Sequence, residues 1–582
     1  MTTAAASPAL TRVPSRVRAA VRSLRPRHLV FAVCLVVVAY IVVGPLVFLG
    51  VGSLSSELSN GTVGDLTLQN YVNAYGDRRV IELILNSLAF SLGSSLVALV
   101  FGTGLAWITE RTDTPLRSAF LAVSLIPLIM PGVLFAIGWI LLIGPRAGIL
   151  SSWWRDLTGL GVPLDIFSLP GMIVIAGIHW APLAFLIMSA AFRSQDPSLE
   201  EAALMCGGSR LSAARRVVLP LTVPALLSLL LLLILRGLET FEVPGLIGLP
   251  AGVEVFSSQI YLAVSQLPAD YGLGGAYAVT LLVLTALGVA VYSRLTRDAS
   301  RFATVTGKGF RPAITRLGRW RILTTAILVA YFLLVVVLPA LAIIWNSFMP
   351  FTTQPSMESA KLWTLDHYDT AFSAEQTGRS VVNSVLLSVG SATVIVLFGA
   401  VLAWLTVRSR IRGAVVLEHL SATALVFPGV VVGISLIWVY LTLPVHIYGT
   451  IWILFIAYLT RYLPFGLRFA SSSMVQMHVE LEEASLTSGA TALQSFRRIT
   501  LPLIWPGLAA GWLYIVVVSM SELSSAVFLW SPPNWVLAVV MFDYWSNGDS
   551  GPVYALGSML IVALVLLTVA YGKVNKKVGV VL

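Results

Sequence analysis

Two segments of the chain repeat one pattern of acidic, small and basic residues that suits electrostatic docking. Each segment favours a short helix, then a glycine that allows a backbone turn, then an Arg-Arg pair on a second amphipathic helix. A Leu-Pro step follows where a new helix can start, because proline's missing N–H costs nothing in a first turn. The residues are Glu200, Glu201, Ala202, Ala203, Gly207, Leu219 and Pro220 in the first segment, and Glu482, Glu483, Ala484, Gly489, Leu501 and Pro502 in the second. The pattern predicts two stiff hairpins that display charge toward something outside the membrane.

Four charged residues stand in stretches otherwise rich in Leu, Val and Ile: Arg236, Glu239, Glu242 and Glu522. An unpaired charge facing lipid costs several kcal/mol, so these side chains should face protein or water. They form a candidate translocation path, and an acidic lining would suit a cation. The alternative is that Arg236 and Glu239 satisfy each other at i, i+3 spacing while the others lie in headgroup water at a span end.

The sequence offers no catalytic or metal-binding set. Gly307-Lys308 is followed by Gly309 and lacks the earlier glycine of a phosphate-binding loop, and no HExxH motif is present. The six histidines are scattered, and we assign none of them to a metal. Cys34 and Cys206 cannot form a disulfide framework and are interpreted as small packing residues. We expect no catalytic residue and no cofactor bound by this chain.

The elements that must position these residues are membrane spans. Of 582 residues, 57% are hydrophobic and 11% are charged, and the mean hydropathy is +0.89. Uncharged blocks long enough to cross a hydrocarbon core of about 30 Å predict an all-α, polytopic membrane protein with about twelve transmembrane helices. The predicted spans are 29–51, 83–107, 119–143, 171–192, 222–247, 273–293, 322–346, 383–407, 415–442, 450–470, 506–530 and 551–571.

The placement of basic residues predicts the orientation. Most of the 37 Lys and Arg residues fall in the N-terminal segment and in alternate loops, which places both termini in the cytoplasm. These basic stretches flank the membrane, so nucleic-acid binding is not expected despite the net charge of +10. The predicted division is a basic N-terminus (1–28), a first transmembrane repeat (29–293), a cytoplasmic linker (294–321), a second transmembrane repeat (322–571) and a cytoplasmic tail (572–582).

The two transmembrane halves repeat each other in sequence. At one constant offset, Asn86-Ser87 matches Asn383-Ser384 and Pro131-Gly132 matches Pro428-Gly429. The same offset pairs Arg111 with Arg408. Each half contains six predicted spans, an even number, so the repeats enter the membrane in the same orientation and are parallel.

The paired docking segments resemble the "EAA" coupling loop of binding-protein-dependent ABC importer permeases. The likeness rests on Glu-Ala-Ala, the later glycine and the Leu-Pro step, and only Ser485 departs from the pattern in the second copy. It implies that Glu201 and Glu483 face two copies of an ABC nucleotide-binding subunit, with Gly207 and Gly489 making the turns. It also implies a plasma (inner) membrane location, an extracytoplasmic solute-binding protein, and ATP with magnesium on the partner ATPase. The chain itself would be a transport subunit without an ATPase site.

A fused chain of this kind resembles ferric-iron transport permeases most closely. The residues that carry this likeness are 238–244 (LETFEVP), 306–309 (TGKG) and Ser521-Glu522-Leu523. The resemblance implies ferric iron as cargo, while thiamine, polyamine and phosphonate permeases share much of the half-repeat. Two other classes stay open: an ion-coupled secondary transporter, which would need coupling carboxylates in mid-span, and an intramembrane enzyme, which would need a nucleophile-base pair or metal ligands.

Overall fold

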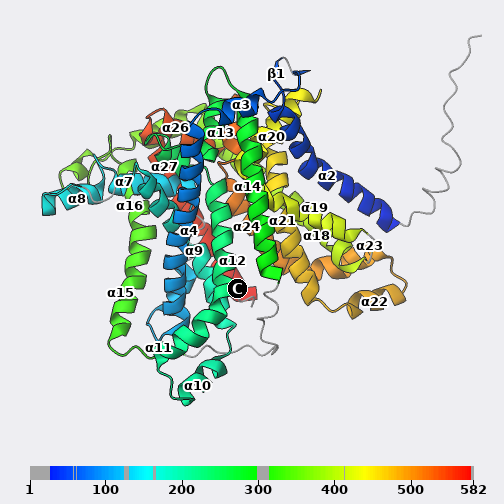
Figure 1. Cartoon of the computed structure of the whole chain (residues 1–582), viewed down its shortest axis with the longest axis horizontal. Helices are drawn as coiled ribbons and strands as arrows, with labels where there is room; N and C mark the ends of the chain where they lie inside the picture. Colours follow the sequence, from blue (N-terminus) through cyan, green and yellow to red (C-terminus); the bar gives the residue numbers. More distant parts are fainter. Residues whose placement is uncertain are drawn as a thin grey trace, which may run out of the picture. The chain divides into compact units, whose positions relative to one another are not determined.

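A computed structural model describes residues 26–56, 58–59, 62–123, 130–161, 165–297, 314–409, 411 and 413–578 (Figure 1). Most of the predicted N-terminal segment, linker residues 298–313 with the TGKG motif, and the last four residues of the tail lie outside this part of the chain. The described part is almost entirely helical, and its one sheet is a two-residue antiparallel pair, Leu58–Ser59 with Thr62–Val63. The predicted all-α, polytopic fold class is confirmed.

The first repeat builds its spans from long helices joined by short surface helices. Its elements are α2 (Pro26–Ser53), α3 (Gln69–Tyr75), α4 (Arg79–Arg111), α5 (Arg117–Val123), α7 (Gly132–Ile143), α8 (Ile149–Thr158), α9 (Leu169–Arg193), α10 (Pro197–Met205), α11 (Arg210–Ala213), η1 (Ala214–Val218), α12 (Leu219–Glu239), η2 (Pro244–Gly248), α13 (Phe256–Ser265) and α14 (Tyr271–Arg297).

The second repeat follows the same order. Its elements are α15 (Trp320–Phe332), η4 (Leu333–Val337), α16 (Leu338–Ser347), η5 (Ser359–Leu362), α17 (Asp366–Ser373), α18 (Glu375–Ala403), η6 (Trp404–Arg408), α19 (Ala414–Thr423), η7 (Ala424–Val426), α20 (Gly429–Thr442), α21 (Ile451–Gln476), α22 (Glu480–Thr487), α23 (Ala492–Ser495), η8 (Phe496–Thr500), α24 (Leu501–Met520), α25 (Ala526–Leu529), η9 (Pro532–Asn534), α26 (Leu537–Ser546) and α27 (Ser550–Val578).

Ten of the predicted spans correspond to helices long and apolar enough to cross a membrane. Nine are such helices within the described residues, and the tenth is the pair α19–η7 and α20, whose two parts meet at 107°. The other two predicted spans contain shorter apolar helices, Gly132–Ile143 and Ser550–Leu566. The breaks recur at repeat-related Pro-Gly steps, where Pro131 and Pro428 are extended (ψ 136° and 144°) and the next helix starts at the glycine.

Two predicted spans run past the ends of their helices. The fifth was predicted over 222–247, but α12 ends at Glu239. The eleventh was predicted over 506–530, but α24 ends at Met520. In both cases the helix stops next to the charged residues singled out in the sequence, so these residues stand at helix ends and in the connections that follow.

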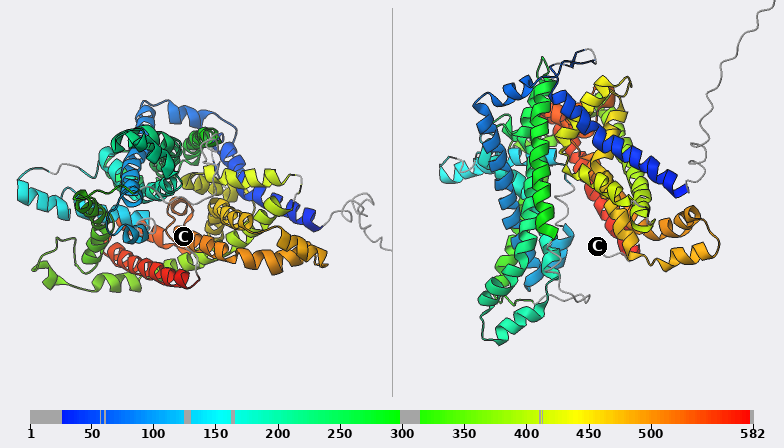
Figure 2. Two further views of the ribbon diagram at one scale, coloured as in Figure 1. Left: turned by 90° about the horizontal axis from the view of Figure 1, so that it is seen from below. Right: turned by 45° about the vertical axis from the view of Figure 1, so that its right-hand side comes forward.

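The described chain groups into two compact units. One contains residues up to 44, 393–424 and 462–513, and the other contains 45–392, 425–461 and 514–582. The second unit holds the first repeat from residue 45 onward together with parts of the second repeat. Within it α4 packs along α9 (Figures 1 and 2), and Gly102 allows the close approach because a Cβ there would lie 2.7 Å from the carbonyl oxygen of Ala181. In the first unit, the repeat-related Gly399 lies equally close to the backbone of Gly466.

Internal contacts repeat along with the sequence. The Ser87 hydroxyl accepts a hydrogen bond from the Phe256 backbone N–H (3.0 Å), and its counterpart Ser384 accepts one from Leu537 (2.7 Å). In each half the serine of the Asn-Ser motif therefore ties the second span to a short helix after the fifth. The duplication read from the sequence is thus also a duplication of hydrogen bonds.

Candidate functional site

The first docking segment folds as a helix, a tight turn and a second helix. Asp196 caps α10 by accepting from the Ser198 N–H at 2.9 Å. After α10 the chain reverses at Gly207, whose φ of +84° is a left-handed conformation that glycine adopts without strain. The N–H of Gly208 then donates to the Ala203 carbonyl at 3.1 Å, which closes the turn.

The second docking segment has the same turn. Gly489 has a φ of +88°, and the N–H of Ala490 donates to the Ser485 carbonyl at 3.1 Å. Thr491 and Gln494 form a capping box at the start of α23. Both segments then pass through a π-helical turn, η1 or η8, into the span α12 or α24. Both docking segments therefore have the helix-turn-helix geometry that the sequence predicts.

An arginine at the end of α4 holds the first segment in place. The Arg111 guanidinium lies 3.1 Å from the Glu200 carboxylate and also donates to Gln195. The two ion-paired side chains are only 3% and 14% exposed. This contact fixes the start of α10 to the end of the second span.

The second segment is held by the repeat-related arginine. Arg408 lies 3.9 Å from the Glu482 carboxylate, and the two side chains are 8% and 11% exposed. Arg408 also donates to the carbonyls of Met474 (2.7 Å) and Met477 (2.6 Å) at the end of α21. The Thr500 hydroxyl donates to Glu482 at 2.5 Å.

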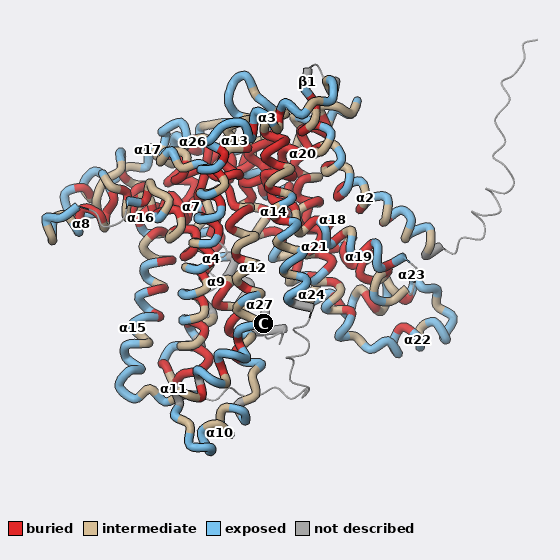
Figure 3. Tube along the Cα trace, in the orientation of Figure 1, coloured by how far each residue is buried: buried red, intermediate tan, exposed pale blue. Residues whose placement is uncertain are grey.

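The two adjacent glutamates of each segment therefore point in different directions. Glu200 and Glu482 turn toward the protein, whereas Glu201 and Glu483 are exposed. Figure 3 shows α22 exposed along most of its length. Of the other predicted docking residues, Ala202, Gly207, Leu219, Pro220, Ala484, Gly489 and Pro502 are exposed, and Ala203 and Leu501 are partly buried.

Sequence reasoning missed the two arginines as functional residues. Their matching positions in the two repeats are visible in the sequence, but the sequence alone does not show what they contact. The signal was present, because an arginine recurred at the end of the second span in each half. Cys206, interpreted as a packing residue, is instead exposed beside the Gly207 turn, while Cys34 is buried.

Three of the four charged residues of the candidate path, all except Glu242, form an ion-paired cluster within one compact unit. Arg236 pairs with Glu239 at i, i+3, as the alternative interpretation held. Glu239 also lies 3.9 Å from Arg461 of α21, which in turn lies 3.2 Å from Glu522. Glu522 is 5% exposed, so it does not lie in headgroup water. The sequence analysis missed Arg461, although an arginine within an apolar span was a visible signal.

Glu242 differs from the other two glutamates of the candidate path, Glu239 and Glu522. It accepts hydrogen bonds from the Thr240 hydroxyl (2.7 Å) and the Ser524 hydroxyl (3.3 Å). Ser524 occupies the position in the second repeat that corresponds to Glu242 in the first. The hydrogen bond between them therefore joins the two repeats. Among the described residues Glu242 belongs to no ion pair. A Cβ on Gly132 would lie 3.0 Å from the Glu242 side chain, which places this carboxylate against the Pro131-Gly132 break.

The balance of charge decides what this cluster can do. Two arginines compensate Glu239 and Glu522, so the paired part is neutral, and only Glu242 adds an uncompensated carboxylate. The expected acidic lining is therefore reduced to one position. Within the described residues no group of three or more His, Cys, Asp or Glu could hold a metal ion.

Comparison with known proteins identifies the class. The chain matches the family described as "Binding-protein-dependent transport system inner membrane component" twice, over residues 80–301 and 395–580. These matches cover more than half of the sequence, and the chain belongs to this family. It is a multi-pass membrane permease of an ABC importer, a transport component of a binding-protein-dependent system.

Similar curated proteins refine the comparison. The chain is 26% identical over 504 residues to "Ferric transport system permease protein FbpB" of Actinobacillus pleuropneumoniae, covering 86% of this chain and 72% of that protein. It is 25% identical over 570 residues to "Probable ABC transporter permease protein y4fN" of Sinorhizobium fredii, covering 94% and 95%. It is 26% identical over 265 residues to "Spermidine/putrescine transport system permease protein PotB" of Haemophilus influenzae, covering 45% and 91%. The predicted likeness to ferric-iron permeases is confirmed.

Proposed function

We propose that this permease imports ferric iron delivered by an extracytoplasmic binding protein. The observation that carries the proposal is the likeness to a ferric transport permease over 86% of the chain, through both repeats. The polyamine permease named above matches only 45% of the chain. In the candidate path, Glu242 would be the carboxylate available to a passing cation. The ion-paired residues Arg236, Glu239, Arg461 and Glu522 would form the wall beside it.

The proposed mechanism passes force through the two docking segments. Two copies of a nucleotide-binding subunit would contact the exposed faces of α10 and α22, with Glu201 and Glu483 at the contact. ATP and magnesium would be bound by those subunits. ATP-driven closure would pull on α10 and α22, and the Arg111 and Arg408 pairs would transmit the movement to α4, η6 and α21. Packed helices joined by short loops can supply the two discrete arrangements that alternating access requires. The proposed location is the inner membrane, with both termini in the cytoplasm.

Uptake of labelled cargo tests the proposed function. Cells that express the permease with its neighbouring ATPase and binding-protein genes should accumulate radiolabelled ferric iron, and cells lacking the permease should not. Excess unlabelled putrescine or thiamine should leave this uptake unchanged. Uptake of labelled putrescine in place of iron would contradict the iron assignment and support the polyamine alternative. Uptake that persists without ATP and collapses with an uncoupler would contradict the coupling mechanism.

A further inference from the structure

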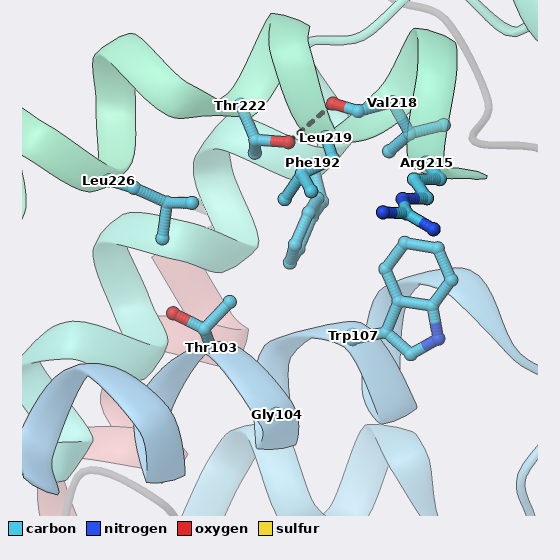
Figure 4. Close-up of a pocket in the computed structure, with 9 residues that line it drawn as sticks. All are labelled: Thr103, Gly104, Trp107, Phe192, Arg215, Val218, Leu219, Thr222 and Leu226. Atoms are coloured by element: carbon cyan, nitrogen blue, oxygen red, sulfur yellow. Dashed lines mark hydrogen bonds between the residues drawn. The ribbon is translucent and has the colours of Figure 1, made fainter. Parts of the chain in front are cut away.

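A pocket opens on the first repeat between α4 and the start of α12 (Figure 4). Its volume is about 450 Å³, within the range of about 300–1,000 Å³ found for small-molecule sites. Its walls include Thr103, Gly104, Trp107, Arg215 and Leu226. All of these residues belong to one compact unit.

The pocket is mainly apolar and has one charged side chain, Arg215, at one end. In Figure 4 Arg215 and Trp107 lie together at one end, and Leu226 lies at the other. Eleven residues of helix separate Arg215 from Leu226, which corresponds to roughly 16 Å. A ligand that fills this space has an apolar body and an anionic group at one end.

The surface around the pocket is apolar and belongs to membrane-spanning helices. Val100 is 68% exposed and Leu219 is 50% exposed. Such a surface on a spanning helix faces lipid chains rather than an aqueous route. Arginine and tryptophan at the end of a span are the residue types that anchor at the membrane interface, and basic pockets between spans bind anionic headgroups.

The two repeats share an aromatic contact here but differ at one position of the pocket wall. In the first repeat Trp107 packs against Phe192 with ring centroids 5.7 Å apart. Trp404, the counterpart of Trp107, packs against Phe496 with ring centroids 5.6 Å apart. Val401 aligns with Gly104. A Cβ on Gly104 would meet nothing within 4 Å, so that position opens onto space. A small residue, Gly104, thus lines the pocket where the second repeat has a valine.

We infer that this pocket binds one acyl chain of an anionic membrane phospholipid, with the lipid phosphate at Arg215. The inference rests on the membrane location of the helices and not on the proposed cargo. Because η1 joins the first docking segment to α12, the lipid would lie directly beside the element proposed to carry the movement of α10.

Native mass spectrometry of the purified full-length permease, titrated with phosphatidylglycerol, tests this site. Gly104→Leu should fill the pocket and remove one tightly retained lipid, and Arg215→Gln should weaken phosphatidylglycerol retention about fivefold. Arg497→Gln, the matched change in the second repeat, should leave retention unchanged. Each variant is first shown to be monodisperse by size exclusion.

A second readout follows the pocket directly. Lipid brominated in the acyl chain should quench the part of the fluorescence that Trp107→Phe removes, and Gly104→Leu should abolish that quenching. Equal lipid retention and equal quenching in wild type and Gly104→Leu would overturn the site. If Arg215→Gln and Arg497→Gln reduced retention equally, the basic residues would attract lipid without a built pocket, and the inference would also fail.

Discussion

At the scale of single residues, the two adjacent glutamates in each docking segment have different surroundings. Glu200 and Glu482 are held by buried arginines, whereas Glu201 and Glu483 are exposed on the same short helices. Neighbouring positions on a helix point about 100° apart, so one can pack inward while the next faces a partner. The first kind would stabilise the hairpin and the second would bind the ATPase.

Reversing the charge of the exposed pair tests their proposed role in binding. We expect Glu201→Lys with Glu483→Lys to abolish transport and co-purification with the ATPase, while the permease still inserts in the membrane. Co-purification and membrane content are measured in parallel. Glu358→Lys, at an exposed position outside both docking segments, is the control and should have no effect. A double variant that still co-purifies and transports would contradict docking through these residues.

For the inward-facing glutamates we expect a loss of protein stability rather than a loss of ATPase binding. Arg408→Ala leaves the buried Glu482 carboxylate without its cation, which should cost about 3 kcal/mol in the free energy of unfolding. Thermal unfolding in detergent measures this loss. Adding Glu482→Ala should restore part of the stability, because no buried charge is then left alone. If the two single losses simply added in the double variant, the pair would not be coupled.

At the scale of elements, the glycine turn sets the shape of each hairpin. Both turns need a left-handed residue at the same place, and both glycines lie in open space. Side-chain volume is therefore not the constraint at these positions. The backbone conformation alone explains why glycine stands there.

Substitution at the turn separates backbone strain from crowding. Gly489→Val should destabilise the hairpin by about 1–2 kcal/mol, because a side chain with a Cβ resists the left-handed region. Gly489→Asn should be milder, since asparagine tolerates this conformation better. Ser488→Val, one residue earlier, is the matched control. Co-purification with the ATPase and thermal unfolding are both measured, and equal effects of Val and Asn would contradict the explanation.

Two predicted spans are broken at repeat-related Pro-Gly steps. Pro131-Gly132 and Pro428-Gly429 interrupt what the hydropathy pattern predicts as continuous helices. A side chain at Gly429 would collide with Arg461, and one at Gly132 would press on Glu242. The breaks therefore let the backbone approach the charged cluster closely, which an unbroken helix with side chains at these positions would prevent.

At the scale of the whole molecule, the orientation in the membrane rests on the distribution of basic residues. Cys206 offers a native probe, because it is exposed in the first docking segment while Cys34 is buried. A membrane-impermeant maleimide should label the permease in inside-out vesicles and not in intact spheroplasts. Cys206→Ser should remove the label. Labelling in intact spheroplasts would place the docking segments on the outer side and would contradict the coupling mechanism.

The sequence by itself determined the features that depend on local or repeated patterns. Long apolar blocks require a membrane, the matched motifs reveal two parallel repeats, and the spacing from Glu201 to Pro220 contains the whole hairpin, because helix, turn and helix start are each decided by nearby residues. The membership in the permease family followed from the same motifs. The breaks at Pro-Gly steps were present in the repeat but were hidden by a hydropathy pattern that continues across them.

Only the tertiary structure decided which charges meet. Arg111 and Glu200 are 89 positions apart, and Arg461 reaches Glu239 at the end of α12 and Glu522 in the connection after α24. No periodicity connects such residues, because their contact depends on how separate helices pack. The same packing paired most of the predicted acidic path with arginines, and among its glutamates only Glu242 has no ion pair within the described residues. The sequence states which charged residues each helix carries. The packing of the helices decides which other residues those charges contact.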